Sequence, residues 1–132
     1  MTNTNTEIVR QYFQAVADGD LDKLPTLFSP DLIWHQPGAS DLSGTYNGLD
    51  AVFTLLGRFM ERSGGSFRID SIGNLLANGD MVAVTLNFSA NEGGRAMSMA
   101  GIDVLRIENG RIHEVWLFSD DQQAEDRFWS GK

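Results

Sequence analysis

The sequence contains no cysteine, which excludes a disulfide framework, thiolate chemistry and any metal site built on cysteine. Basic residues are also scarce, because 10 lysines and arginines stand against 18 aspartates and glutamates, for a formal net charge of -8. Nucleic acids and anionic membrane surfaces are bound by clustered basic side chains, so we expect neither as a partner. No apolar run approaches the ~20 residues that span a bilayer, and the polar N-terminal residues lack a secretory pattern. We therefore expect a cytoplasmic protein.

Hydrophobic residues make up 42% of the 132 residues, which is enough for the core of one domain covering residues 1–132. Apolar residues at helical spacing predict helices within residues 8–16, 21–28 and 49–60, with Gly19 at the end of the first and Asp20 capping the second. Residues 39–46 are rich in small and polar side chains and predict a loop. Alternating patterns separated by glycine-containing turns predict strands at 32–36, 67–77, 81–90, 96–107 and 111–119, before a terminal helix at 122–129.

This order of elements predicts an α+β fold. Four strands in sequence joined by short turns form a curved, mostly antiparallel sheet, and three N-terminal helices pack on one of its faces. A sheet that curls around helices makes a cone-shaped barrel whose interior can stay open as a ligand pocket.

Asp103 stands out within this pattern, since it lies in line with the apolar residues Met99, Leu105 and Ile107. Burying an ionised carboxylate without partners is costly, so such a group is usually paired, protonated or functional. A structural role, in which Asp103 bonds to a neighbouring strand or to Tyr12, is the alternative. The sequence therefore predicts an acidic side chain within the core, which either belongs to a functional site or forms a structural hydrogen bond.

Several short motifs, in this order and spacing, resemble the nuclear transport factor 2-like superfamily and in particular its SnoaL-like branch. The motifs are Tyr12-Phe13, Leu27-Phe28-Ser29-Pro30-Asp31, Trp34-His35-Gln36-Pro37-Gly38, Gly44-Thr45-Tyr46-Asn47-Gly48, Ile102-Asp103-Val104 and Glu114-Val115-Trp116. The superfamily includes ketosteroid isomerases, polyketide cyclases and binding domains without activity. The resemblance implies the cone-shaped, cystatin-like fold, whereas a fold alone does not fix a function.

The resemblance also implies roles for individual residues. Asp103 matches the protonated aspartate of ketosteroid isomerases and Tyr12 the tyrosine beside it, a pair that stabilises developing enolate charge. The general base of those enzymes falls on Gln36, whose amide cannot take up a proton at neutral pH. His35 has a suitable pKa in its unperturbed state, although strand alternation sends His35 and Gln36 to opposite faces.

A second possible acid or base lies after the last strand. The position of Asp120 behind Trp116 resembles the acid/base aspartate of SnoaL-like cyclases. The alternative is that Asp120 or Asp121 only caps the terminal helix, because aspartate is a good N-cap residue. The predicted catalytic residues are therefore Tyr12, His35, Asp103 and Asp120.

Aromatic and methionine side chains suit the lining of a pocket for a flat, apolar molecule, although they serve equally well as core. The predicted substrate-binding residues are Trp34, Gln36, Phe53, Met60, Met99, Trp116 and Phe118. His35 and His113 have no carboxylates at metal-site spacing, and the nucleotide-binding motifs are missing. We expect neither a metal nor a cofactor.

Three functional hypotheses follow. The first is a cofactor-independent isomerase or cyclase that moves a proton next to a carbonyl of a polyketide, terpenoid or steroid-like molecule. The second is a non-catalytic binding protein for a small apolar ligand, which the glutamine at position 36 favours. The third is an interaction domain. Members of the superfamily commonly pair through the sheet, so we expect a homodimer in any of the three cases.

Overall fold

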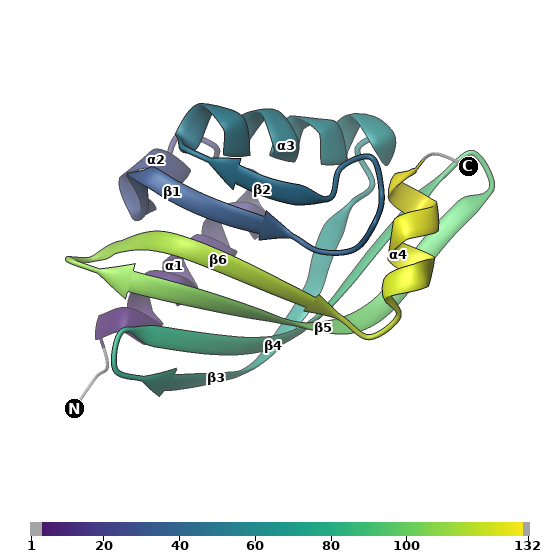
Figure 1. Ribbon diagram of the computed structural model, residues 1–132. Coiled ribbons are helices and arrows are strands. Elements are labelled where there is room, and N and C mark those ends of the chain that lie inside the picture. Colours follow the sequence, from purple (N-terminus) through teal and green to yellow (C-terminus); the bar gives the residue numbers. More distant parts are fainter. Residues whose placement is uncertain (1–3, 131–132) are drawn as a thin grey trace.

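The computed structural model describes residues 4–130, which form four helices and one six-stranded sheet (Figure 1). The polar start Met1–Asn3 lies outside the described residues. The elements are α1 (Thr4–Asp18), α2 (Leu24–Leu27), β1 (Phe28–Gln36), β2 (Gly44–Asn47), α3 (Leu49–Arg62), β3 (Arg68–Asn78), β4 (Met81–Glu92), β5 (Arg95–Glu108), β6 (Arg111–Ser119) and α4 (Gln122–Trp129). The predicted α+β fold is confirmed.

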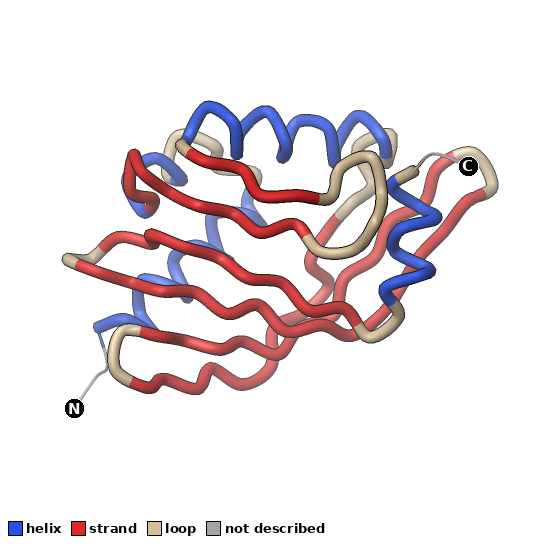
Figure 2. Tube along the Cα trace, viewed as in Figure 1, coloured by secondary structure: helices blue, strands red, loops and turns tan. Residues whose placement is uncertain are grey.

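The strand order in the sheet is β2-β1-β6-β5-β4-β3. Neighbouring strands are antiparallel except β1 and β6, which run parallel. The long strands β3 to β6 are joined by very short turns (Figure 2). Asn109 and Gly110 both have positive φ, at 53° and 75°, which a two-residue hairpin turn requires and which asparagine and glycine tolerate.

The two long helices form where the apolar spacing predicts them. Helix α1 buries Val9, Tyr12, Phe13 and Ala15, and α3 buries Val52, Leu55 and Phe59. Gly19 ends α1 with a φ of 66°, and the backbone N–H of Asp20 donates to the carbonyl of Ala15 at 2.9 Å. This is the left-handed termination that glycine favours.

Two local predictions are wrong. The second helix is only the short α2, and Lys23 rather than Asp20 occupies its N-cap position. The predicted loop at 39–46 ends in strand β2, which pairs with β1. The alternation rule misses this strand because it lies at the sheet edge, with only Tyr46 half-buried, so backbone bonding rather than an apolar face defines it.

The sheet has an inner face, which packs against α1 and α3, and an outer face turned away from them. Side chains of β4, β5 and β6 at Val82, Val84, Leu105 and Val115 are fully buried on the inner face. Their neighbours in sequence belong to the outer face, because strand residues alternate. The core therefore lies between the inner face and the helices.

Helix α4 closes one end of this core. Its Trp129 is 1% exposed and packs on Phe59, with the ring centroids 4.6 Å apart. Two arginines bind the carbonyls at its C-terminal end: Arg62 donates to Trp129 O, and Arg95 donates to Phe128 O at 2.6 Å. None of the helices within residues 4–130 is long and apolar enough to cross a membrane.

Candidate functional site

Asp103 lies on the inner face in apolar surroundings. It pairs with Val84 on one side and with Leu117 on the other, and Leu105 follows it on the same face of β5. Burial first, and the charge of Glu125 second, raise the pKa of Asp103 from 3.8 to about 7. A carboxyl group with this pKa can both release and take up a proton near neutral pH.

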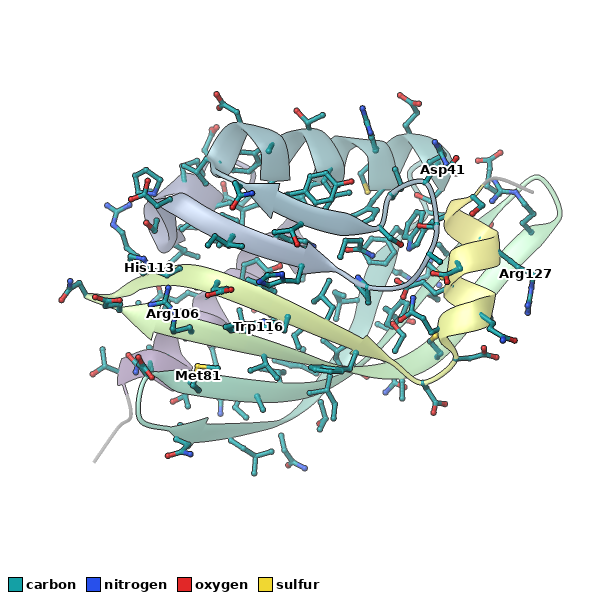
Figure 3. The ribbon with its side chains drawn as sticks, viewed as in Figure 1. Asp41, Met81, Arg106, His113, Trp116 and Arg127 are labelled. Atoms are coloured by element: carbon teal, nitrogen blue, oxygen red, sulfur yellow. The ribbon has the colours of Figure 1, made fainter. Side chains whose placement is uncertain are left out.

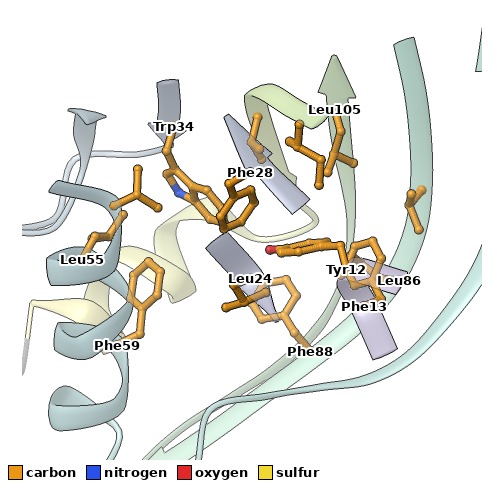
Figure 4. Packing of buried hydrophobic residues seen from close by; sticks show 14 of the residues in the cluster. Tyr12, Phe13, Leu24, Phe28, Trp34, Leu55, Phe59, Leu86, Phe88 and Leu105 are labelled. Carbon is orange, nitrogen blue, oxygen red and sulfur yellow. The ribbon is translucent and has the colours of Figure 1, made fainter. Parts of the chain in front are cut away.

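Tyr12 approaches the same place from α1. Its ring is 5.5 Å from that of Phe28, and its hydroxyl points toward the middle of the apolar cluster (Figure 4). Burial, and secondly the charge of Asp103, raise the pKa of the Tyr12 phenol well above its ordinary value of 10.0. The phenol therefore keeps its proton and remains a hydrogen-bond donor.

The polar ends of these two side chains have no hydrogen-bond partner among residues 4–130. Every buried side-chain nitrogen and oxygen in that part of the chain is either bonded or in contact with accessible space. Tyr12, although only 5% exposed, therefore keeps its hydroxyl in contact with such space, and so does the half-buried Asp103 with its carboxyl. Polar groups left open in an apolar interior are suited to binding a polar atom of a ligand.

Of the two neighbours Gln36 and His35 on β1, Gln36 faces inward. Gln36 is 5% exposed, and its Oε1 accepts a hydrogen bond of 3.1 Å from Trp34 Nε1. His35 pairs with Trp116 in the parallel ladder, so Gln36 lies next to Leu117, the partner of Asp103. Two strand spacings separate Gln36 from Asp103, or roughly 10 Å.

Glu125 belongs to the same interior, although no motif or spacing in the sequence marks it. This α4 carboxylate is 6% exposed and accepts three hydrogen bonds: from Ser119 Oγ at 2.7 Å, Gln122 Nε2 at 3.0 Å and Trp129 Nε1 at 3.1 Å. In the sequence it is one acidic residue in a polar terminal helix. Its burial depends on how α4 packs, which no local pattern reveals.

His35 is part of a separate cluster on the outer face. Its Nε2 is 2.6 Å from Glu114 Oε2, and its ring stacks on Trp116 at a centroid distance of 5.5 Å. Arg106 Nε lies 3.8 Å from the other oxygen of Glu114. Figure 3 shows Arg106 and Trp116 close together on the side of the sheet turned away from α1. The sheet separates this cluster from Tyr12 and Asp103.

Trp116 and Phe118 also lie on the outer face, because of a bulge in β6. Ile112 and Val115 are both fully buried although they are three residues apart, and the register with β5 shifts between Arg106 and Ile107. One extra residue reverses the alternation along the rest of the strand. Phe118 is consequently 59% exposed. Neither aromatic residue lines the interior.

Asp120 and Asp121 have different positions. Asp121 caps α4, since its side chain accepts a hydrogen bond of 3.0 Å from the N–H of Ala124. Asp120 is exposed and lines an open hollow of about 460 Å³ on the outer face, together with Ile102 and Phe118. The structure therefore does not bring His35 or Asp120 to the Tyr12–Asp103 pair.

The other predicted lining residues are divided between interior and surface. Phe53 and Met99 are half-buried and pack against the core, whereas Met60 on α3 is 44% exposed. Within residues 4–130, no group of three or more His, Asp or Glu side chains is arranged to hold a metal ion. The inner site therefore consists of Tyr12, Asp103 and Gln36, with Glu125 beside them.

Comparison with known proteins agrees with this architecture. A crystal structure of a protein of unknown function with a cystatin-like fold from Xanthomonas campestris is 47% identical, with a TM-score of 0.92 over 97% of this chain and 98% of that one. Bal32a, from a soil-derived mobile gene cassette, is 31% identical, with a TM-score of 0.90 over 96% of each chain. TerC, co-crystallised with polyporic acid, shares the fold at 18% identity, with a TM-score of 0.84 over 96% of this chain and 98% of its own.

The family model for the SnoaL-like domain matches residues 9–115, which include most of α1 and most of the sheet. The matched segment contains Tyr12, Gln36 and Asp103, whereas α4 and Glu125 lie beyond its end. The resemblance that the sequence motifs indicate is thereby confirmed, and the chain belongs to the SnoaL-like domain family.

Proposed function

We propose that this chain is a cofactor-independent isomerase or cyclase that moves a proton next to the carbonyl group of a small, apolar molecule. The observation that supports this most directly is the Tyr12–Asp103 pair, whose polar ends face the interior without partners among the described residues. The pKa of about 7 for Asp103 suits proton transfer near neutral pH. Asp103 thus takes the role of the base that Gln36 cannot fill.

In the proposed reaction, the ionised carboxylate of Asp103 removes a proton from the carbon next to the substrate carbonyl. The C–H bond breaks, an O–H bond forms on Asp103, and the electron pair moves onto the carbonyl oxygen as an enolate. The Tyr12 hydroxyl donates a hydrogen bond to this oxygen, which lowers the energy of the developing charge. When the substrate has a C=C bond between its β and γ carbons, the O–H bond on Asp103 then breaks and the proton forms a C–H bond at the γ carbon. The electron pair on the oxygen re-forms the C=O bond, and the C=C bond moves next to the carbonyl. The isomerisation therefore needs no further reactant.

The apolar side chains around the site favour an apolar substrate. The interior is occupied by aromatic rings, including Phe28 and Phe53 with centroids 6.3 Å apart. When these side chains rearrange, the apolar rings of a polyketide, terpenoid or steroid-like molecule can pack against them in place of the contacts that they make with one another. The amide N–H groups of Gln36 have no acceptor among the described residues, 4–130, and lie roughly 10 Å from Asp103 by strand spacing. They would bind a second polar group of the same ligand.

A non-catalytic binding protein is the second candidate. The observation in its favour is Gln36, which contributes hydrogen bonds and no acid/base chemistry at the position of the family's usual base. Under this proposal Tyr12, Gln36 and Asp103 hold the polar groups of a ligand that leaves unchanged.

Deuterium uptake by a bicyclic ketone such as 2-tetralone in D₂O, followed by NMR, tests the enzymatic proposal. We expect the wild-type protein to accelerate exchange next to the carbonyl, and Asp103→Asn to reduce the acceleration by ~100-fold or more. Tyr12→Phe should reduce it less, because the base remains. Asp22→Asn, which alters an exposed carboxylate, is the matched control and should leave the rate unchanged.

The two candidates give different results in this experiment. Shifts of the Tyr12 and Asp103 resonances on addition of the ketone, without accelerated exchange, would support the binding protein. Equal acceleration by wild-type protein and Asp103→Asn would contradict the assignment of Asp103 as the base.

We also propose that two copies of the chain pair through the outer face of the sheet. Ile102 and Phe118 lie opposite one another on β5 and β6 and are 41% and 59% exposed. Large apolar side chains side by side on an open sheet face are typical of an interface between proteins.

A further inference from the structure

Glu125 is a buried carboxylate without a cationic partner among residues 4–130. Its three hydrogen-bond donors, Ser119, Gln122 and Trp129, are all neutral. The nearby arginines, Arg62 and Arg95, donate to backbone carbonyls at the end of α4 instead. Three neutral donors stabilise a carboxylate, but the negative charge stays uncompensated inside the protein.

The strand register places this charge next to the inner site. Ser119, which donates to Glu125, pairs with Gly101 on the inner face. Asp103 is two residues beyond Gly101 and therefore a diagonal neighbour of Ser119 on the same face. The charge of Glu125 correspondingly contributes to the raised pKa of Asp103.

Contacts on several sides fix the position of α4 and so of Glu125. Gln122 bridges Glu125 and Asp126, and Asp126 in turn accepts a hydrogen bond of 2.9 Å from the N–H of Ala39 in the loop after β1. The guanidinium carbon of Arg95 also lies 4.8 Å from the ring centroid of Phe128. Helix α4 is thus attached to β5, to β6 and to the loop. These contacts hold the Glu125 carboxylate in a fixed position beside the inner site.

From this arrangement we propose that Glu125 is a positioning residue for the Tyr12–Asp103 site and that its fixed charge makes the site select neutral carbonyl compounds over carboxylates. The inference rests on the proposed function and deepens it. An anionic ligand would meet two carboxylates in a medium of low polarity, where repulsion between like charges is strong. A neutral carbonyl meets the protonated Tyr12 and suffers no such repulsion.

A titration of Asp103 tests the positioning role without any ligand. In protein labelled with ¹³C at the aspartate and glutamate carboxyl carbons, the Asp103 signal should titrate at a pH of about 7. In Glu125→Gln the midpoint should fall by about 1 pH unit or more, because the like charge that raises the pKa of Asp103 is removed. Glu61→Gln makes the same chemical change at an exposed position of α3, away from the inner site, and should leave the midpoint in place.

Matched probes test the selectivity. The ketone 2-acetylnaphthalene and the anion 2-naphthoate share one ring system, and tryptophan fluorescence reports their binding. We expect the wild-type protein to bind the ketone at least ~10-fold more tightly than the anion, and Glu125→Gln to narrow this ratio. Glu61→Gln should keep the wild-type ratio.

The outcomes separate this inference from the function on which it rests. An unchanged Asp103 midpoint in a folded Glu125→Gln protein would overturn the positioning role, whatever the ligand data show. A shifted midpoint with no binding of either probe would support the positioning role and count against the proposed ligand class. If Glu125→Gln does not fold, Glu125→Asp replaces it: this variant shortens the side chain by one methylene and displaces the charge, so an unchanged Asp103 midpoint would again overturn the positioning role.

Discussion

The inner and outer faces of β5 and β6 depart from the usual distribution of polar and apolar residues in opposite directions. On the inner face, the titratable Asp103 lies between Val84 and Leu117. One residue away on the outer face, Ile102 and Phe118 are exposed. An ionised carboxyl group in the core lowers the stability of the fold, whereas large apolar side chains exposed to water favour association with another protein surface. The strands β5 and β6 therefore carry two candidate sites, one on the inner face for a ligand and one on the outer face for a second copy of the chain.

The largest expected effect is the difference in unfolding free energy between a truncation on the inner face and one on the outer face. Leu105→Ala removes a fully buried side chain and should lower the free energy of unfolding by about 2–5 kcal/mol. Phe118→Ala removes a side chain that is 59% exposed, and in the monomer it should change this free energy by about 0.5 kcal/mol or less. Urea denaturation at a concentration where the protein is monomeric measures both. Similar losses for the two variants would contradict the assignment of the faces.

The pH dependence of stability should reveal the carboxyl group of the inner face. The pKa of Asp103 is higher in the folded protein, at about 7, than its unfolded value near 3.8, so the folded state binds the proton more tightly. Its contribution to stability is therefore complete below pH 3.8 and is lost as the pH rises through 7. The full shift corresponds to up to about 4 kcal/mol, and the contact of Asp103 with accessible space reduces this value.

Asp103→Asn removes this titration from the folded state. We expect the difference in unfolding free energy between wild type and Asp103→Asn to change in favour of the variant as the pH increases from 4 to 8. Urea denaturation across that range measures it, with Asp22→Asn as the exposed control. A difference that does not vary with pH would show that Asp103 titrates normally.

A charge on the outer face should separate the proposed dimer and leave the fold unchanged. Phe118→Glu places a carboxylate where the second copy would bury an apolar ring, so we expect sedimentation to change from a dimer to a monomer. Leu21→Glu is the matched control, because Leu21 is 68% exposed and precedes α2, away from the sheet. A wild-type protein that sediments as a monomer at micromolar concentration would refute the pairing.

Part of the architecture could be predicted from local chemistry. Asn109-Gly110 defines its turn because these residues tolerate positive φ, and the apolar spacing of α1 and α3 identifies their buried stripes. Asp103 could be identified as unusual because it interrupts an apolar row. Strand β2 could not be predicted, since an exposed edge strand has no apolar face to mark it.

The position of each candidate side chain depended on the tertiary structure. Alternation indicates which residues share a face of a strand, but it does not indicate which face the helices cover. The pairing of β1 with β6 turned Gln36 inward and His35 outward, and the bulge before Val115 placed Trp116 and Phe118 outside. Each reversal follows from a single residue of register, which local sequence does not encode.

Local sequence patterns are sufficient to specify the order of helices and strands, the turns between the long strands and an acidic residue within an apolar strand. Only the tertiary structure placed Tyr12 beside that residue and buried Glu125 of α4 behind it. The physical reason is the range of the interactions involved. Turn geometry and apolar periodicity act over a few residues, whereas the environment of Asp103 is set by groups 91 residues before it and 22 residues after it along the chain.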